Sequence, residues 1–169
     1  MKRINCLSDL LIEELADLLN AENQLVEALP KMVQAGEPSA LKAALENCLD
    51  MSREHIDQLQ DIFGNMRQNP PKMTCTAIKG FIAESEDAVN KTEKGPHCDA
   101  GIISVMKRVE NYKITAYLIA YEHTMDLGYT RIMKLLHKML NEERVINFHL
   151  NELAQGMINI QAIDPNGSR

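Results

Sequence analysis

The amino-acid sequence predicts an all-α protein. Only 4 % of its 169 residues are aromatic and none is Trp, whereas residues that favour helices dominate and include ten Met. Apolar residues recur every three or four positions in long segments, as they do on one face of a helix. A chain of this length with 45 % apolar residues can form one compact domain. We expect that domain to span residues 1–161, followed by a flexible tail, "AIDPNGSR", at 162–169.

Glycine and proline mark the ends of the expected helices. The turn segments are "AGEPS" (35–39), "NPPK" (69–72), "KGPH" (94–97) and "LGYT" (127–130). They leave four long helices, at 6–35, 39–67, 97–127 and 130–160, and a shorter one at 75–91. Short turns join the first two and the last two long helices, so each pair should form an antiparallel hairpin. The sequence therefore predicts a four-helix bundle of two hairpins, with an extra short helix in the long crossover.

Charge and composition exclude several classes of function. The net charge of −6 and the lack of a Lys/Arg run argue against nucleic acid as a partner. Asp9, Glu13 and Glu14 interrupt the N-terminal apolar residues, so we expect no signal sequence, no membrane span and a cytoplasmic location. The four cysteines are too widely separated for a zinc site. No nucleophile motif or phosphate loop is visible, and we assign no catalytic residue.

Each long helix carries a core stripe at alternating steps of three and four residues, and each stripe is apolar except near its middle. The interruptions are Glu22, His55, Glu110 with Lys113, and Glu143. Glu22 and His55 are 33 residues apart, as are Glu110 and Glu143. Folding each hairpin at its turn brings these positions to similar heights. We therefore expect one polar cluster on the bundle axis.

The chemistry of such a cluster has more than one interpretation. A single glutamate in a stripe can extend to water along its apolar stem, and a single histidine can bond a backbone carbonyl. Four interruptions at one level are harder to explain in this way, because an unpaired buried carboxylate is costly. Inward-facing Glu and His at one level of a helix bundle are the ligands of dinuclear iron or manganese sites. A histidine phosphotransfer role is disfavoured, because His55 lies in the buried stripe.

Several segments resemble a known family in sequence and in order. They include "LADLLNAENQLVEALPKM", "LKAALENCLDMSREHIDQLQDIF", "AGIISVMKRVENYKITAYLIAYEHTMDLGY" and "LLHKMLNEERVINFHLNELA". The chain is similar over nearly its whole length to the YciF/YciE-type stress proteins, a ferritin-like family. This resemblance implies a ferritin-like bundle with a dinuclear metal site, bacterial origin, a homodimer and a role in stress responses.

The resemblance also assigns site positions. It implies metal ligands at Glu22, His55, Glu110 and Glu143. It places Met51, Lys113 and Asn147 where the family pattern has carboxylates. Two metal ions need about four carboxylates and imidazoles to balance their charge, and this chain has lost three acids. An ammonium is repelled by metal ions but attracted by glutamates. We therefore predict a degenerate site without cofactor, in which Lys113 replaces the charge of the metal.

Two alternatives remain open at this point. The four implied ligands could hold a single iron, manganese or zinc ion with Lys113 turned away, as in a metal-dependent oxidase or peroxide-detoxifying protein. Asp50 or Glu54 could replace the missing acid if their helix is slightly rotated.

Overall fold

The structure is a computed structural model that describes residues 4–158, and all the regular elements in this part of the chain are helices. Its elements are α1 (Leu7–Ala35), α2 (Ser39–Met66), α3 (Thr76–Lys91), α4 (Pro96–Asp126), α5 (Thr130–Leu153) and the π-helical segment η1 (Ala154–Ile158). The predicted all-α class is confirmed, and the bounds of the first four helices agree within one residue. Residues 159–160 of the last expected helix, and the expected tail at 162–169, lie outside the described residues.

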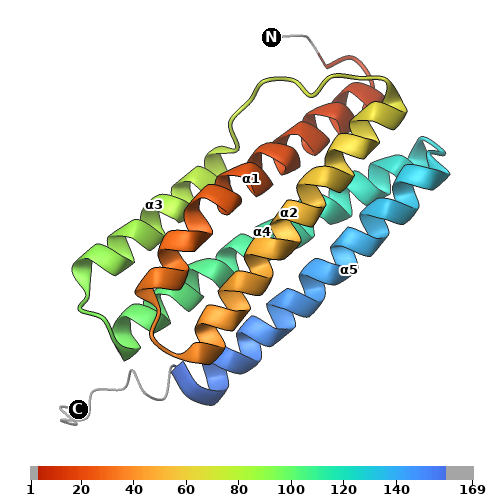
Figure 1. Cartoon of the computed structure of the whole chain (residues 1–169). Helices are drawn as coiled ribbons and strands as arrows, with labels where there is room; N and C mark the ends of the chain where they lie inside the picture. The colour runs from red at the N-terminus through yellow and green to blue at the C-terminus, as the bar shows by residue number, and fades with distance from the viewer. Residues whose placement is uncertain (1–3, 159–169) are drawn as a thin grey trace.

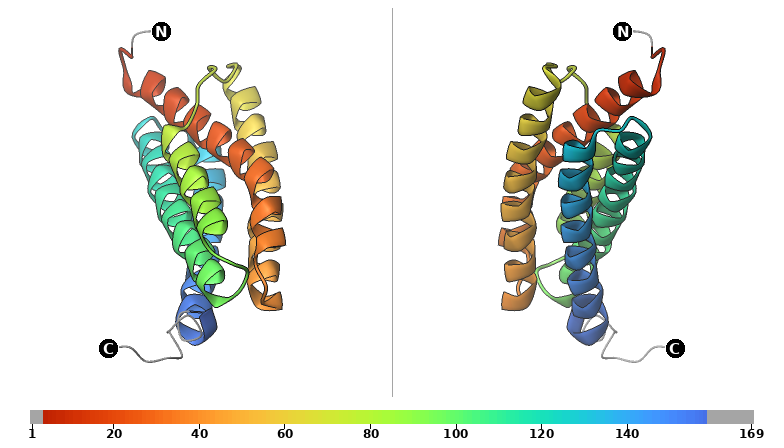
Figure 2. Two further views of the ribbon diagram at one scale, coloured as in Figure 1. Left: turned by 90° about the vertical axis from the view of Figure 1, so that its left-hand side faces the viewer. Right: turned by 90° about the vertical axis from the view of Figure 1, so that its right-hand side faces the viewer.

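The long helices lie side by side in two antiparallel pairs, α1 with α2 and α4 with α5 (Figure 1). α3 lies outside these pairs, against α1 and α4, and the segment 67–75 leads to it from the far end of α2 (Figure 2). α2 and α5 complete the arrangement by running next to each other. Across the described residues, every helix is too short or too polar to cross a membrane.

The tight turns between helices follow from local sterics and hydrogen bonding. Gly36 ends α1 where a Cβ would lie 3.2 Å from the Leu41 side chain. Gly95 precedes α4 with a φ of +134°, a conformation that residues with a Cβ rarely adopt. The buried Asp99 carboxylate accepts a hydrogen bond from the backbone N–H of Glu37 at 3.0 Å. This bond fastens the α1–α2 turn to the first turn of α4.

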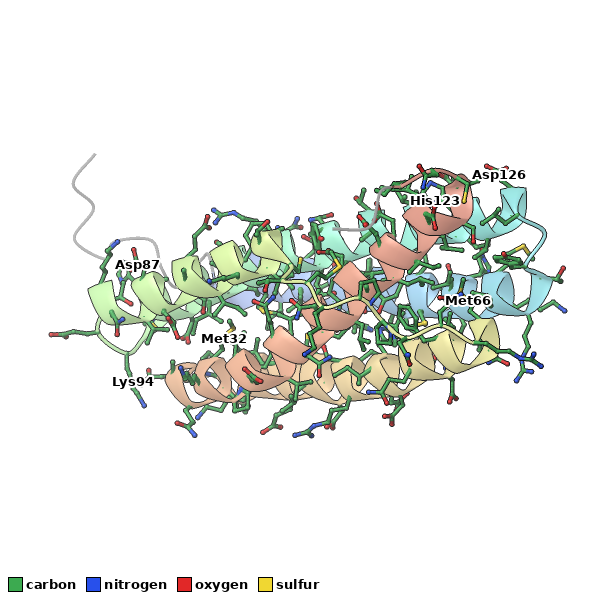
Figure 3. The ribbon with its side chains drawn as sticks, turned by 90° about the horizontal axis from the view of Figure 1, so that it is seen from above. Met32, Met66, Asp87, Lys94, His123 and Asp126 are labelled. Atoms are coloured by element: carbon green, nitrogen blue, oxygen red, sulfur yellow. The ribbon has the colours of Figure 1, made fainter. Side chains whose placement is uncertain are left out.

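The core consists of two apolar clusters with polar side chains between them. One cluster includes Leu25, Met32 and Leu45, and the other includes Leu15 and Leu59. In the view from above, the labelled Met32 and Met66 lie toward opposite ends of the elongated molecule (Figure 3). The core stripes are buried as the periodicity predicts, with only Met66 and Leu153 half-buried among their described side chains.

A group of amides attaches the crossover to α1. Asn20 Oδ1 accepts hydrogen bonds from the Cys75 backbone N–H and from Gln24 Nε2, both at 2.7 Å. Gln24 Nε2 also donates to the Cys75 carbonyl at 3.1 Å. Both backbone groups of Cys75 are thereby satisfied at the point where α3 begins.

We expect Asn20→Ala to destabilise the protein by about 1–2 kcal/mol, because it leaves the partly buried Cys75 N–H without its acceptor. Urea unfolding followed by circular dichroism measures the loss. The control is Asn23→Ala, since Asn23 bonds only to the Leu19 carbonyl of its own helix. Equal losses in the two variants would show that the crossover attachment contributes nothing specific.

Candidate functional site

The polar residues of the core stripes meet in one buried cluster. Its members are Glu22 from α1, His55 from α2, Glu110 and Lys113 from α4, and Glu143 from α5, all 0 % exposed. Each helix supplies its polar residue from the same stripe that carries its core residues, because steps of three and four keep one face directed inward. The expected juxtaposition of these five side chains is therefore present.

The Lys113 ammonium lies among the three acids. Its Nζ is 2.8 Å from Glu143 Oε1, 3.3 Å from Glu22 Oε2 and 4.0 Å from Glu110 Oε2. Burial opposes the charged form, but Glu110, Glu143 and Glu22 outweigh it and raise the Lys113 pKa well above its usual range. The ammonium is therefore held charged inside the protein.

His55 contacts carboxylates through both ring nitrogens. Its Nδ1 is 2.9 Å from Glu143 Oε1 and 3.4 Å from Glu22 Oε1, and its Nε2 is 3.2 Å from Glu142 Oε2. Burial lowers the His55 pKa, but hydrogen bonds to Glu143 and Glu22 and the charges of these acids raise it to about 9. Both nitrogens therefore carry protons at neutral pH, and the ring is an imidazolium.

The pKa values of two of the acids are shifted in opposite directions. Burial raises the Glu110 pKa well above its usual range, Lys113 offsets only part of this, and Glu143 raises it further. Burial would also raise the Glu143 pKa, but Lys113 and hydrogen bonds from Glu110 and His55 lower it below its usual range. In the described part of the chain, neither Glu110 oxygen has a donor. A neutral Glu110 that donates its proton to the Glu143 carboxylate satisfies both groups.

Tyr117 is a member of the cluster whose role the sequence did not reveal. Its hydroxyl donates to Glu22 Oε1 at 2.8 Å, and its ring meets that of His55 edge to face at a centroid distance of 5.4 Å. Burial and the nearby charge of Glu22 raise the Tyr117 pKa well above its usual range, so the phenol remains a donor. The signal that could have found it is its position in the α4 stripe, four residues after Lys113.

Glu142 was not among the site residues expected from the sequence, and it links the cluster to solvent. Its side chain is 23 % exposed, and its Oε1 lies 3.0 Å from Lys138 Nζ while Oε2 contacts His55. The alternative in which Asp50 or Glu54 replaces the missing acid has no support in the structure, because both side chains are exposed on α2. Glu142 of α5 places a carboxylate beside His55 instead. The sequence signal for Glu142 was its spacing of four residues from Lys138, which allows an ion pair on one helix face.

The other two altered positions border the cluster without joining its ion pairs. Met51 is half-buried and packs against the apolar core. Asn147 directs its amide to Asn111 Oδ1 at 3.5 Å rather than to a cluster carboxylate. Within the described residues, its own Oδ1 is buried without a partner.

The donor set fits metal ions only after rearrangement. Glu22, His55 and Glu143 offer ligand atoms within 4.8 Å of one another, a spacing compatible with one ion. The ammonium of Lys113 lies beside two of these ligands, and the imidazolium of His55 has no free lone pair. A single ion would require Lys113 to move and His55 to lose a proton. Two ions do not fit this set, because it has only three buried acids and two cations already lie among them.

Comparison with known proteins defines the family. Residues 6–163 match the family described as a domain of unknown function, DUF892. The chain belongs to the DUF892 family. It is 32 % identical over 159 residues to protein YciF of Escherichia coli strain K12, covering 92 % of this chain and 95 % of that protein. The resemblance to the YciF/YciE-type stress proteins is thereby confirmed.

Solved structures of relatives have the same architecture as this DUF892 chain. The crystal structure of the E. coli stress protein YciF matches with a TM-score of 0.88 and 29 % identity, over 92 % of this chain and 99 % of that one. YcfI from Rhodopseudomonas palustris, proposed to be a structural protein, matches with a TM-score of 0.85 and 31 % identity, over 89 % and 96 %.

We expect His55 to stabilise this DUF892 protein in a pH-dependent way. Its folded pKa of about 9 exceeds the ordinary value of 6.5, so its contribution is complete below about pH 6.5 and is lost as the pH rises to about 9. At about 1.4 kcal/mol per pH unit, the contribution amounts to a few kcal/mol.

The measurement is the difference in free energy of unfolding between wild type and His55→Gln from pH 6 to pH 9.5. The control is His137→Gln, on the exposed side of α5. A difference that stays constant across this range would show that His55 is not an imidazolium in the folded protein.

Proposed function

We propose that this protein is a cytoplasmic, ferritin-like four-helix bundle protein of the bacterial stress-response type, and that it is not a catalyst. Its dinuclear metal site has degenerated into a metal-free cluster in which Lys113 supplies the positive charge. The observation that carries this proposal is the position of the Lys113 Nζ, within 4.0 Å of a carboxylate oxygen from each of three helices.

The charge of the cluster supports the same conclusion. The Lys113 ammonium and the His55 imidazolium lie among the three buried acids, and the raised pKa of Glu110 disfavours its charged form. The cluster therefore brings cations and acids together without any metal ion. Adding two divalent cations to the same cavity would leave a large uncompensated positive charge in a region of low dielectric.

A structural role follows from the way the cluster joins the two hairpins. Lys113 of α4 forms an ion pair with Glu22 of α1, and Glu143 of α5 forms one with His55 of α2. Such contacts define the relative height of the hairpins, because a shift by one turn would separate the charges. One relative is called a stress protein and another has been proposed to be structural, which agrees with this role.

The second candidate is a metal-dependent oxidase or peroxide-detoxifying protein. The spacing of Glu22, His55 and Glu143 favours it, since these donors suit one iron, manganese or zinc ion. In that case the three residues would bind the ion, and the ion would supply the redox or Lewis-acid chemistry.

We expect Lys113→Met to destabilise the protein by about 3–5 kcal/mol at neutral pH, because it leaves buried acids without their cation. The loss should shrink at low pH, where the acids become protonated. Urea unfolding at several pH values measures it, with Lys107→Met on the partly exposed side of α4 as the control. An unchanged stability would contradict burial of the ammonium among the acids.

Metal analysis of protein purified without chelators separates the two functions. We expect wild type to contain no stoichiometric metal, and the triple variant Met51→Glu, Lys113→Glu, Asn147→Asp to bind iron or manganese, since it restores three acids. The control is Met51→Gln, Lys113→Gln, which removes the ammonium without adding acids. Two metal ions per wild-type chain with peroxide consumption would overturn the proposal, and one tightly bound ion would favour the second candidate.

A further inference from the structure

The extra helix α3 leaves a hollow where it lies against α1 (Figure 2). The hollow has a volume of about 220 Å³, much more than a single water molecule needs. Side chains in a well-packed interior interdigitate and leave few voids of this size. All the residues that line the hollow belong to these two helices, and none of them is a member of the buried cluster. The hollow is therefore a separate feature of the molecule.

Two small residues account for the unfilled space. The stripe of α3 that faces the bundle consists of Ile78, Ile82, Ser85 and Val89, so that a serine interrupts apolar positions at helical spacing. On the opposite wall, α1 presents the buried Ala28. Neither side chain is long enough to cross the space between the helices. The hollow thus results from the packing of two regular helices.

The hollow combines apolar walls with one polar group that has no partner. Met32 is buried, and Ile82 and Val89 are half-buried beside it. Ser85 is only 2 % exposed, and within residues 4–158 its hydroxyl forms no hydrogen bond. A buried hydroxyl without a partner destabilises a protein. A ligand that brings a hydrogen-bond acceptor into the hollow would satisfy it.

Charged side chains of both helices lie at the mouth of the hollow. The Lys31 Nζ of α1 is 3.2 Å from the Glu86 Oε1 of α3, and both side chains are exposed. An ammonium has three protons, so Lys31 can keep Glu86 and donate to a second acceptor. The carboxylate of Glu86 already has its cation. The free donor capacity at this site therefore favours an anionic ligand over a cationic one.

We propose that this hollow binds a small monocarboxylate with an apolar chain. The carboxylate accepts hydrogen bonds from the Ser85 hydroxyl and the Lys31 ammonium, and the chain packs against Met32, Ile82 and Val89. Both donors can meet one carboxylate, because Lys31 reaches across to the residue that follows Ser85. This site does not depend on the state of the buried cluster or on the proposed function.

The volume of the hollow limits the length of the chain. An apolar cavity of about 150 Å³ in another protein holds benzene, so a hollow of about 220 Å³ suits roughly eight or nine non-hydrogen atoms. Hexanoate is of this size. Long-chain fatty acids are too large to be enclosed, and acetate is too small to reach the apolar walls.

An NMR titration of the full-length protein with three six-carbon probes tests the proposal. Hexanoate should shift the backbone amide signals of Ser85 and Val89, with a dissociation constant of roughly 0.1–5 mM, as expected for so few atoms. Hexan-1-ol should bind about tenfold more weakly, since it lacks the charge that pairs with Lys31. Hexylamine should not bind, because its ammonium is repelled by that of Lys31.

Three variants separate the parts of the site. Ser85→Ala should weaken hexanoate binding about tenfold, because it removes a hydrogen bond to a charged group. Lys31→Met should weaken it about threefold, as expected of an exposed ion pair, and leave hexan-1-ol unaffected. Ala28→Leu fills the hollow and should abolish the binding of both. The matched controls are Ser104→Ala on α4 and Lys79→Met on the exposed side of α3, which should bind hexanoate like wild type.

Several results would overturn the proposal. They are an absence of shifts at about 20 mM hexanoate, well above the expected dissociation constant, shifts confined to helices other than α1 and α3, and hexylamine binding as tight as that of hexanoate. Undiminished hexanoate binding by Ser85→Ala or by Ala28→Leu would do the same. Circular dichroism of each variant separates loss of binding from loss of folding.

Discussion

The structure depends on the burial of one ammonium group. The Lys113 side chain lies in a core without exposed surface, and a charge in that position is tolerated only when opposite charges surround it. The required acids come from α1, α4 and α5, and an imidazolium from α2 completes the set. All four long helices must therefore place a particular residue at the same height.

The cluster determines how the core is divided. Apolar residues on either side of it form two separate clusters, and between them the ion pairs of the polar layer join the two hairpins. Apolar packing tolerates small shifts along a helix, whereas the ion pairs between the hairpins, at 2.9 and 3.3 Å, do not. The apolar core stabilises the packed helices, and the charged layer determines how far each hairpin is shifted along the other.

The three departures from the family pattern are consistent with one another. Replacing an acid by Lys113 adds positive charge, and the neutral Met51 and Asn147 remove negative charge that metal ions would otherwise balance. On the proposed function, together they convert a ligand set that needs cations into one that carries its own. On the proposed function, Lys113 among the five remaining acids of the family pattern would be a poor substitute for two metal ions, so the loss of the other two acids belongs to the same change.

The sequence by itself determined the helices, their bounds and the burial of Glu22, His55, Glu110, Lys113 and Glu143, because a helical period reports which residues share a face. Only the tertiary structure decided which side chains meet across helices. Glu142 reaches His55 from a neighbouring helix while Asp50 and Glu54 are exposed to solvent. Tyr117 donates to Glu22, and burial beside Glu143 raises the Glu110 pKa. These outcomes depend on the distances between side chains of different helices and on their burial, which the sequence pattern of a single helix does not reveal.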